Sequence, residues 1–198
     1  ALVPPNAPRL VRFLFDAHGY ELFELGEFNA DPHPGNVMYD EASGVVSLID
    51  YGQLISVTEA DRVHYARLFL AMEARDADTA LEAFARLGQE FTYKPTGEKN
   101  PREETLAVAK FHFGGSAGIA EGLETFGFDS LADAMGPKMT ELFEITSFGA
   151  EYAMVQRMGF CLNGVGQNLG TGGISQAKLL SPAAARFLAA RGLKRTYE

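Results

Sequence analysis

Residues 29–52 read NADPHPGNVMYDEASGVVSLIDYG, and the rest of the chain can be understood around them. An acid, Asp31, precedes an amide, Asn36, by five positions, and a second acid, Asp50, ends an apolar run just before Gly52. Carboxylate and amide oxygens suit Mg²⁺. Phosphoryl transfer depends mainly on metal ions at the phosphates and on an acid that orients the acceptor. The stretch therefore predicts a magnesium and nucleotide site of that kind.

The local sequence places these polar residues at the ends of short strands. The prolines and glycine within residues 28–36 disfavour helix and strand, so we expect a loop there. Residues 37–39 and 45–49 are expected to form two strands joined by a polar turn. Loops beside a hairpin hold polar groups rigidly and leave them accessible.

Each half of the pattern is weak by itself. The DPHPGN segment is compatible with an Asx turn in an ordinary surface loop, and an Asp-Tyr-Gly tripeptide alone carries no information. The functional interpretation depends on finding Asp31, Asn36 and Asp50 within one window of 24 residues, with strands between them.

Composition limits the classes of protein that fit. The chain has 198 residues, of which 46% are hydrophobic and 22% charged, which is ordinary for one soluble globular domain spanning residues 1–198. A net charge of -9 argues against a general nucleic-acid binder. The single cysteine, Cys161, excludes an internal disulfide and suits a reducing compartment. We find no signal peptide and no transmembrane stretch.

Apolar periodicity predicts helices on both sides of the central stretch. Residues 9–26 form a bracing helix that ends at Gly26, and residues 57–198 form a helical body. Within that body we expect a helix capped by Thr58, a helix from Asp76 or Asp78, and helices over 106–113 and 141–162, with a last helix opened by Ser181 and Pro182.

Two segments of this body are expected to lack regular structure. Residues 93–103 are polar and predict an exposed loop, and the glycine-rich residues 113–120 predict a mobile turn. A second glycine-rich run, 164–170, looks like a dinucleotide loop, but it follows a helical pattern and lacks the acid that such a loop requires. Packing and termination of a helix explain its glycines better.

Other candidate site residues favour structural interpretations. The four histidines show no paired metal spacing, and His18 and His64 are expected on helix surfaces or half-buried. Cys161 has no evident activating partner and is expected to be a core thiol.

The central motifs also resemble those of kinases. Asp31 and Asn36 match the Asp and Asn of the H-R-D-L-x-x-x-N signature, and residues 50–52 match its later D-F-G. The segment ADPHPGN, followed by the segment LIDYG, resembles the motifs of the UbiB or aarF-domain (ADCK) family of atypical kinases. The resemblance is specific over residues 28–70, including Arg62, and diffuse beyond them.

That resemblance implies a fold and a set of roles. The fold would be α+β and mostly α: a protein-kinase-like C-lobe with a catalytic-loop hairpin followed by a helical body. Asp31 would be the catalytic acid, and Asn36 and Asp50 would bind Mg²⁺ or Mn²⁺. His33 and Gly52 would join Asn36 and Asp50 around ATP. Asn29 departs from the family's frequent His, and Tyr51 from its Phe; both changes look tolerable.

One part of a kinase is missing from the sequence. A kinase carries a lysine for the phosphates before its catalytic loop. No lysine precedes Asp31 here, and no glycine- or alanine-rich nucleotide loop is present. The resemblance therefore implies a C-lobe with the N-lobe absent, belonging to a longer protein. Weak nucleotide binding and little turnover are expected from it in isolation.

Three function hypotheses follow. The first, implied by the family, is a kinase or ATPase that supports ubiquinone or other prenylquinone biosynthesis. Its partners would be a prenylquinone or other lipid and membrane-bound biosynthetic proteins, without nucleic acid, at a mitochondrion, chloroplast or bacterial inner membrane. The second is a small-molecule phosphotransferase of the aminoglycoside or choline kinase type, whose loop is similar. Ala30 and Pro32 favour the first. The third is a non-catalytic, pseudokinase-like interaction module.

Overall fold

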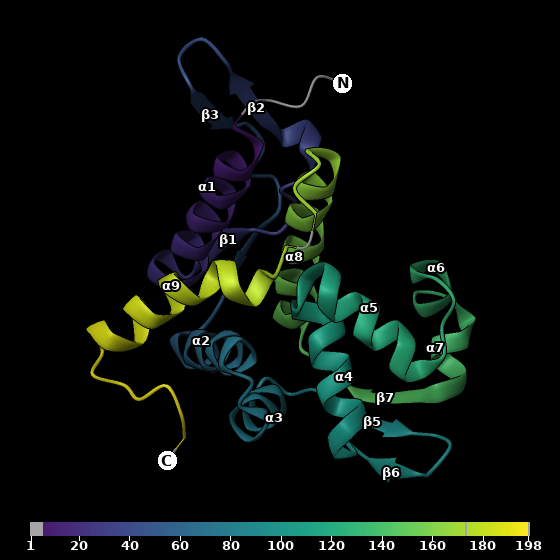
Figure 1. Ribbon diagram of the computed structural model, residues 1–198. Helices are drawn as coiled ribbons and strands as arrows, with labels where there is room; N and C mark the ends of the chain where they lie inside the picture. The colour runs from purple at the N-terminus through teal and green to yellow at the C-terminus, as the bar shows by residue number, and fades with distance from the viewer. Residues whose placement is uncertain (1–5, 173, 198) are drawn as a thin grey trace.

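The structure is a computed structural model that describes residues 6–172 and 174–197 (Figure 1). It is mostly helical with small antiparallel sheets, in agreement with the expected α+β class. The long helices are α1 (Ala7–Tyr20), α2 (Glu59–Ala74), α3 (Ala77–Arg86), α4 (Arg102–Phe113), α5 (Gly115–Phe126), α8 (Ala150–Asn168) and α9 (Gln176–Ala190). The short helices are the π-helical turn η1 (Glu21–Leu25), the 3₁₀ turn η2 (Pro34–Asn36), α6 (Leu131–Ala134) and α7 (Pro137–Leu142).

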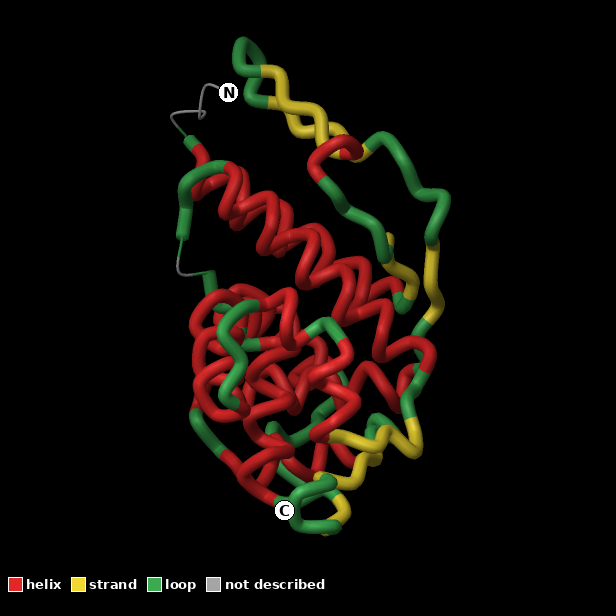
Figure 2. The backbone as a smooth tube through the Cα atoms, turned by 90° about the vertical axis from the view of Figure 1, so that its right-hand side faces the viewer, coloured by secondary structure: helices red, strands yellow, loops and turns green. Residues whose placement is uncertain are grey.

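The predicted hairpin is present and stands at one end of the molecule (Figures 1 and 2). Strands β2 (Val37–Asp40) and β3 (Val45–Leu48) pair antiparallel, with Asp40 opposite Val45. The turn between them closes at Gly44, whose φ of 70° lies in the left-handed region that glycine adopts without strain. The hairpin prediction is confirmed.

A second strand pair, which the sequence pattern did not predict, joins the ends of the central stretch. Strand β1 (Glu27–Asn29) pairs antiparallel with β4 (Leu54–Ser56), and Phe28 lies opposite Ile55. The loop prediction for residues 28–36 was therefore wrong at its start. Phe28 is fully buried, so burial of this side chain, which only the packed structure supplies, favours the strand.

The bracing helix begins two residues earlier than predicted and ends as predicted. Helix α1 runs directly into η1, and Gly26 closes η1 with a φ of 77°. Gly19 lies within α1. Close packing explains a glycine at this position, because a Cβ there would come 3.0 Å from the Cβ of Ala183 on α9. Arg62 of α2 donates from Nη1 to the carbonyl oxygen of Phe23 at 2.9 Å and so caps η1 from the side. Phe13 of α1 is exposed.

Helix caps agree with the sequence in α2 and α3 but not in α9. The Thr58 hydroxyl accepts from the Asp61 N–H, and the Asp76 carboxylate accepts from the Thr79 N–H. Helix α9 begins at Gln176 after a Ser175 cap, so the predicted start at Ser181 was wrong. Ser181 instead donates from its hydroxyl to the carbonyl oxygen of Ala177 at 2.7 Å, and Pro182 lies inside the helix.

The glycine-rich residues 113–120 form the start of helix α5, not a mobile turn. Helices α4 and α5 cross closely, and a Cβ at Gly118 would overlap the carbonyl oxygen of Lys110. A Cβ at Gly122 would come 2.9 Å from the Cβ of Phe111. The glycines thus permit close contact between two helices. Tertiary packing therefore favours a helix here in spite of the low helix propensity of glycine.

A three-stranded sheet corrects two further predictions. Strands β5 (Glu90–Tyr93), β6 (Glu98–Lys99) and β7 (Phe143–Ser147) lie in the order β6-β5-β7. The predicted loop over 93–103 is therefore partly a hairpin, and the predicted helix over 141–162 starts only at residue 150. Phe91 and Phe143 meet edge to face across the sheet, with ring centroids 5.1 Å apart.

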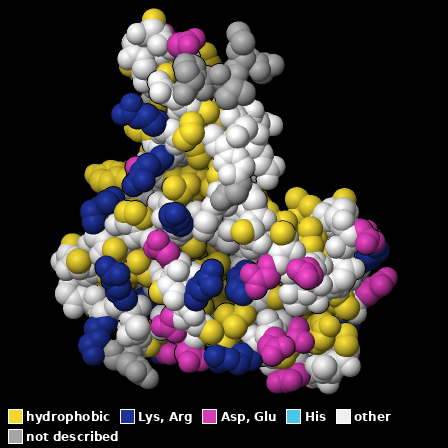
Figure 3. All heavy atoms as spheres, viewed as in Figure 1, with side chains coloured by type: hydrophobic (Ala, Val, Ile, Leu, Met, Phe, Trp, Pro, Cys, Tyr) yellow, Lys and Arg dark blue, Asp and Glu magenta, His cyan; other side chains and the backbone are white. Residues whose placement is uncertain are grey.

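Charge is unevenly spread over the surface. In Figure 3, Lys and Arg side chains follow the edge formed by α1 and α9, and many Asp and Glu side chains lie at the lower right, beneath α4 to α7. None of the helices within the described residues is long and apolar enough to cross a membrane.

A pair of glycine substitutions tests the close contact between α4 and α5. Gly118→Ala should lower the free energy of unfolding by about 1–3 kcal/mol, because the added Cβ overlaps backbone atoms. Gly164→Ala, in α8 with open space around its Cβ, should raise it by about 0.5–1 kcal/mol. Urea unfolding measures both, and equal effects would contradict the assigned contact.

Candidate functional site

The three predicted polar residues meet around one cavity. Asp31, Asn36 and Asp50 line a cavity of about 190 Å³, together with Gly52 and the side chains of Asn29 and Gln53. Asp31 follows β1, Asn36 ends η2, and Asp50 follows β3. The β1–β4 pair and the hairpin thus bring two motifs that are separated in sequence to one place.

The side chain of Asn29 joins the two motifs directly. Asn29 is buried; its Nδ2 donates to the carbonyl oxygen of Asp50 at 2.6 Å, and its Oδ1 accepts from the N–H of Asp31 at 3.0 Å. A buried amide with both ends bonded fixes the positions of both acids. The sequence interpretation treated Asn29 only as a tolerable departure from a family pattern and missed this role.

Backbone hydrogen bonds hold the remaining edges of the cavity. The N–H of Ala30 donates to the carbonyl oxygen of Gln53 at 3.0 Å. The N–H of Ile49 donates to the carbonyl oxygen of Asn36 at 3.1 Å. The Asn36 side chain donates from Nδ2 to the carbonyl oxygen of Asp31 at 3.1 Å. These bonds orient the Asn36 amide and connect all segments around the site.

Glycine at position 52 leaves space for the side chain of Asp50 to approach the backbone. The N–H of Gly52 donates to Asp50 Oδ1 at 2.8 Å, and a Cβ on Gly52 would come 3.0 Å from the same oxygen. Its φ is not in the left-handed region, so the benefit of glycine here is space beside the carboxylate.

His33, also expected beside the nucleotide, lies outside the lining of this cavity. It is exposed, and its Nδ1 accepts from the N–H of Gly35 at 3.0 Å, which caps the 3₁₀ turn η2. A nucleotide role for His33 stays a prediction.

Helix α8 contributes two residues that the sequence interpretation missed. Arg157 Nη2 lies 3.0 Å from Asp31 Oδ1, and Cys161 Sγ lies 3.9 Å from the same oxygen. Gln53 donates to the other oxygen, Oδ2, at 3.5 Å. Arg157 is the only charged residue between Glu151 and Lys178, and this lone charge was the signal that could have identified it.

The sequence predicted that Cys161 is a core thiol. In the structure it is half-buried and lies beside the carboxylate of Asp31. Burial, and next the negative charge of Asp31, raises the pKa of the Cys161 thiol above its ordinary value. The thiol stays protonated near neutral pH, and a protonated thiol is a poor nucleophile.

A buried polar group supports the cavity from behind. Glu21 of η1 is buried; its Oε1 accepts from the Tyr51 hydroxyl at 2.9 Å, and its Oε2 accepts from the Asn29 N–H at 3.3 Å. Burial raises the pKa of Tyr51 to about 12, with the Glu21 charge adding to the effect. The Tyr51 hydroxyl therefore links Glu21 to the second motif, a contact that Phe could not make.

His18 corrects another expectation, since it is fully buried instead of lying on a helix surface or half-buried. Its Nδ1 donates to the carbonyl oxygen of Leu14 at 2.8 Å, and its Nε2 lies 3.9 Å from Glu21 Oε2. Burial lowers the pKa of His18, against the opposing effect of the Glu21 charge. His64, by contrast, is half-buried as expected.

The oxygen atoms left at the cavity suit a hard cation. Within residues 6–172 and 174–197, Asn36 Oδ1 and Asp50 Oδ2 accept no hydrogen bond. The other polar atoms of the same two side chains, Asn36 Nδ2 and Asp50 Oδ1, are hydrogen-bonded. The same residues include no group of three His, Cys, Asp or Glu side chains that could hold a metal ion. One carboxylate and one amide fit Mg²⁺, which usually keeps several water ligands and takes others from a phosphate.

Comparison with known proteins agrees with this geometry. Residues 6–84 match the family model described as ABC1 atypical kinase-like domain. Over these residues, the chain is similar to ABC1 atypical kinase-like domains. The resemblance to aarF-domain kinases seen in the motifs is thereby confirmed, and the matched segment contains every residue of the 190 Å³ cavity.

Curated relatives extend the comparison. The chain is 30% identical over 91 residues, 46% of its length, to Protein ACTIVITY OF BC1 COMPLEX KINASE 8, chloroplastic, of Arabidopsis thaliana. It is 27% identical over 146 residues, 73% of its length, to an uncharacterized protein of Synechocystis, and 34% identical over 71 residues, 34% of its length, to AarF domain-containing protein kinase 1 of Gallus gallus. These alignments cover 12%, 20% and 14% of the three relatives.

Removal of the Tyr51 hydroxyl tests the buried support. Tyr51→Phe should lower the free energy of unfolding by about 1–2 kcal/mol near neutral pH, because it deprives buried Glu21 of a donor. The Tyr51 pKa is raised on folding, so this contribution is complete below pH 10 and is lost as the pH rises through about 12. Urea unfolding of both proteins at several pH values measures the difference. A gap that widened above pH 10 would contradict the assignment.

A double-mutant cycle tests the contact between α8 and Asp31. Asp31→Asn and Arg157→Gln should show a coupling energy of about 0.5–1 kcal/mol at low salt, which falls as salt is added, because both side chains are partly exposed. A matched cycle of Asp50→Asn with Arg157→Gln should show no coupling. Denaturant unfolding gives both values, and equal coupling in the two cycles would refute the assigned pair.

Proposed function

We propose that this chain holds the catalytic acid and the metal ligands of an ABC1-type atypical kinase or ATPase that acts on Mg-ATP. The observation that carries the proposal is the meeting of Asp31, Asn36 and Asp50 at one cavity. An acid, an amide and a second acid are the side chains that the kinase motifs supply for phosphoryl transfer. The match of residues 6–84 to the family favours this function over the small-molecule phosphotransferase alternative.

The metal would be held by Asn36 Oδ1 and Asp50 Oδ2. The Asn36 amide is oriented by its bond to the Asp31 backbone, and Asp50 by its bonds to Gly52 and Asn29. Such prior orientation lowers the entropy that binding would cost. When bound, Mg²⁺ or Mn²⁺ would neutralise charge on the phosphate oxygens.

Asp31 would orient the acceptor hydroxyl or water and take its proton. Arg157 and Gln53 each contact one of its carboxylate oxygens, so the carboxylate is fixed in direction beside the cavity. A base held in a productive direction is the main help that the protein gives in phosphoryl transfer. We regard Arg157 as a positioning residue for Asp31.

The biological setting belongs to the same proposal. A relative named as chloroplastic supports a plastid location. The resemblance of the motifs to the aarF-domain family is the basis on which we include a role in ubiquinone or other prenylquinone biosynthesis next to membrane-bound proteins. The chain spans a fifth or less of the length of these curated relatives, so the activity of a whole protein of this type is part of the proposal.

Paramagnetic Mn²⁺ tests the metal site in the chain itself. Mn²⁺ should broaden the backbone amide signals of Asn36, Asp50 and Gly52 before other signals, because broadening falls steeply with distance from the ion. Asp50→Asn should raise the Mn²⁺ concentration needed by about tenfold or more, because it removes the charged ligand. Asp40→Asn, at the exposed hairpin turn, is the matched control and should leave the titration unchanged.

Mg-ATP is then added in a thermal-shift measurement. Saturation to about 100 times the Kd should add about 2.7 kcal/mol of stability, and Asp50→Asn should abolish the shift. Broadening centred elsewhere, or an equal effect of the Asp50 and Asp40 variants, would refute the metal site. Metal binding without any nucleotide shift would instead support the non-catalytic module.

A further inference from the structure

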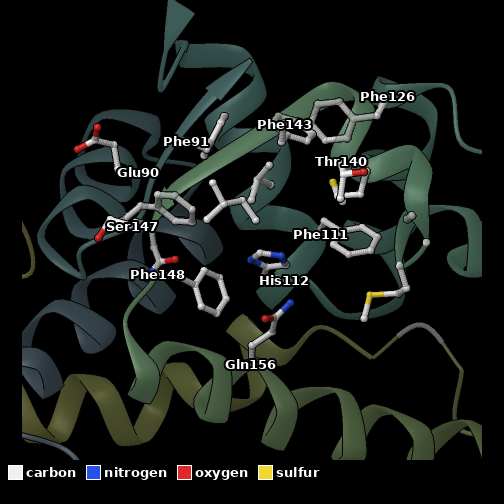
Figure 4. Close-up of a pocket in the computed structure, with 18 residues that line it drawn as sticks. Glu90, Phe91, Phe111, His112, Phe126, Thr140, Phe143, Ser147, Phe148 and Gln156 are labelled. Carbon is white, nitrogen blue, oxygen red and sulfur yellow. The ribbon is translucent and has the colours of Figure 1, made fainter. Parts of the chain in front are cut away.

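A second cavity, of about 280 Å³, lies almost entirely outside the segment that matches the family. Residues of α3, α4, β5, α5, α6, α7, β7 and the first turns of α8 line it (Figure 4). No residue of the Asp31 cavity lines it, so it is a separate site.

The lining is apolar and rich in aromatic rings. Phe91, Phe111, Phe126, Phe143 and Phe148 surround the space, and Met139 adds a thioether. Aromatic faces and sulfur atoms interact favourably with the edges and faces of other rings. A dry apolar cavity of about 150 Å³ takes up benzene, so the larger volume here has room for one or two fused rings.

One polar side chain of the lining, His112, is held by a hydrogen bond to a buried hydroxyl. His112 lies between Phe111 and Phe148, and the side chain of Gln156 points toward it (Figure 4). His112 Nδ1 lies 2.6 Å from the hydroxyl of Tyr152, which is itself buried. Within the described residues that hydroxyl has no other hydrogen-bond partner. A proton on Nδ1 would leave both the hydroxyl proton and Nε2 without a partner, whereas a hydroxyl that donates to Nδ1 leaves only the Nε2 proton unpaired, so we assign the proton to Nε2.

The Nε2 proton has no acceptor among the described residues. Burial lowers the pKa of His112 to about 3, so the ring is neutral and its free N–H is a neutral donor. A charged ligand would lose its hydration here without gaining a counter-ion. The carboxylate at the rim, Glu90, is already paired with Lys99 at 2.9 Å. The chemistry of the cavity thus selects an uncharged ligand with an acceptor.

The entrance is also apolar. Met135, Ile145 and Phe148 line the cavity and expose 67%, 58% and 45% of their surface. Exposed apolar side chains beside a preformed hollow are typical of a ligand entrance.

We propose that this cavity binds an uncharged molecule of one or two fused aromatic rings whose carbonyl oxygen accepts a hydrogen bond from His112 Nε2. This site does not depend on the proposed kinase function, because no residue is shared between the two cavities.

Three probes of similar shape test the proposal by calorimetric or NMR titration of the whole chain. The neutral ketone 1-acetonaphthone should bind saturably. The hydrocarbon 1-ethylnaphthalene, which lacks the carbonyl, should bind about tenfold more weakly, because it covers the His112 N–H without accepting a hydrogen bond from it. The anion 1-naphthoate should bind more weakly still. Equal binding of the ketone and the hydrocarbon would overturn recognition by His112, and no saturable binding of the ketone would overturn the site.

A pair of matched variants locates the binding. Met139→Trp fills the cavity and should weaken ketone binding by about tenfold or more. Met38→Trp, on the exposed face of the hairpin, introduces the same ring elsewhere and should not change it. Similar losses in both variants, or none in either, would overturn the assignment.

One measurement requires no substitution and therefore no assumption about folding. Long-range ¹H–¹⁵N NMR of His112 in the wild-type chain should show a protonated Nε2 and an unprotonated Nδ1. The ketone, and not the hydrocarbon, should shift the Nε2 signal. A proton on Nδ1, or an unchanged signal on saturation with the ketone, would overturn the proposal.

Discussion

The buried side chain of Asn29 holds the candidate active site together. Its amide accepts from the backbone of Asp31 and donates to the backbone of Asp50, so one residue sets the distance between the two acids. An amide buried with either end unbonded would cost about 1–3 kcal/mol. The β1–β4 pair and the Glu21 carboxylate, which accepts from the Asn29 N–H, hold the amide where both bonds can form.

The site therefore depends on support from elements that carry no phosphoryl-transfer chemistry. Glu21 belongs to the π-helical turn after α1, and Arg62 of α2 bonds to the carbonyl of Phe23 in that turn. The hydroxyl of Tyr51, the residue after Asp50, donates a hydrogen bond to Glu21. A chain of partly buried hydrogen bonds thus runs from the bracing helix to both motifs, and loss of one member would leave another group unpaired.

Helix α8 connects the two cavities. Adjacent residues on this helix face different sites: Gln156 lines the aromatic cavity, and Arg157 pairs with Asp31. Tyr152, one turn earlier, is hydrogen-bonded to Nδ1 of His112. A rigid helix that supplies side chains to both sites fixes their relative position.

The sequence by itself determined the local features of this protein. Turn chemistry fixed the hairpin at Gly44, capping fixed the starts of α2 and α3, and the spacing of Asp31, Asn36 and Asp50 identified the candidate site, because these signals act over a few residues. Only the tertiary structure decided β1, β7 and helix α5, since the burial of Phe28, the contact of Phe91 with Phe143 and the close approach of Gly118 to Lys110 are packing effects that local sequence patterns do not contain. The role of Asn29 likewise depends on the fold, which brings Asp50 next to it. Arg157 and Cys161 reach Asp31 only in the folded chain, where a helix more than a hundred residues along the chain meets the Asp31 loop.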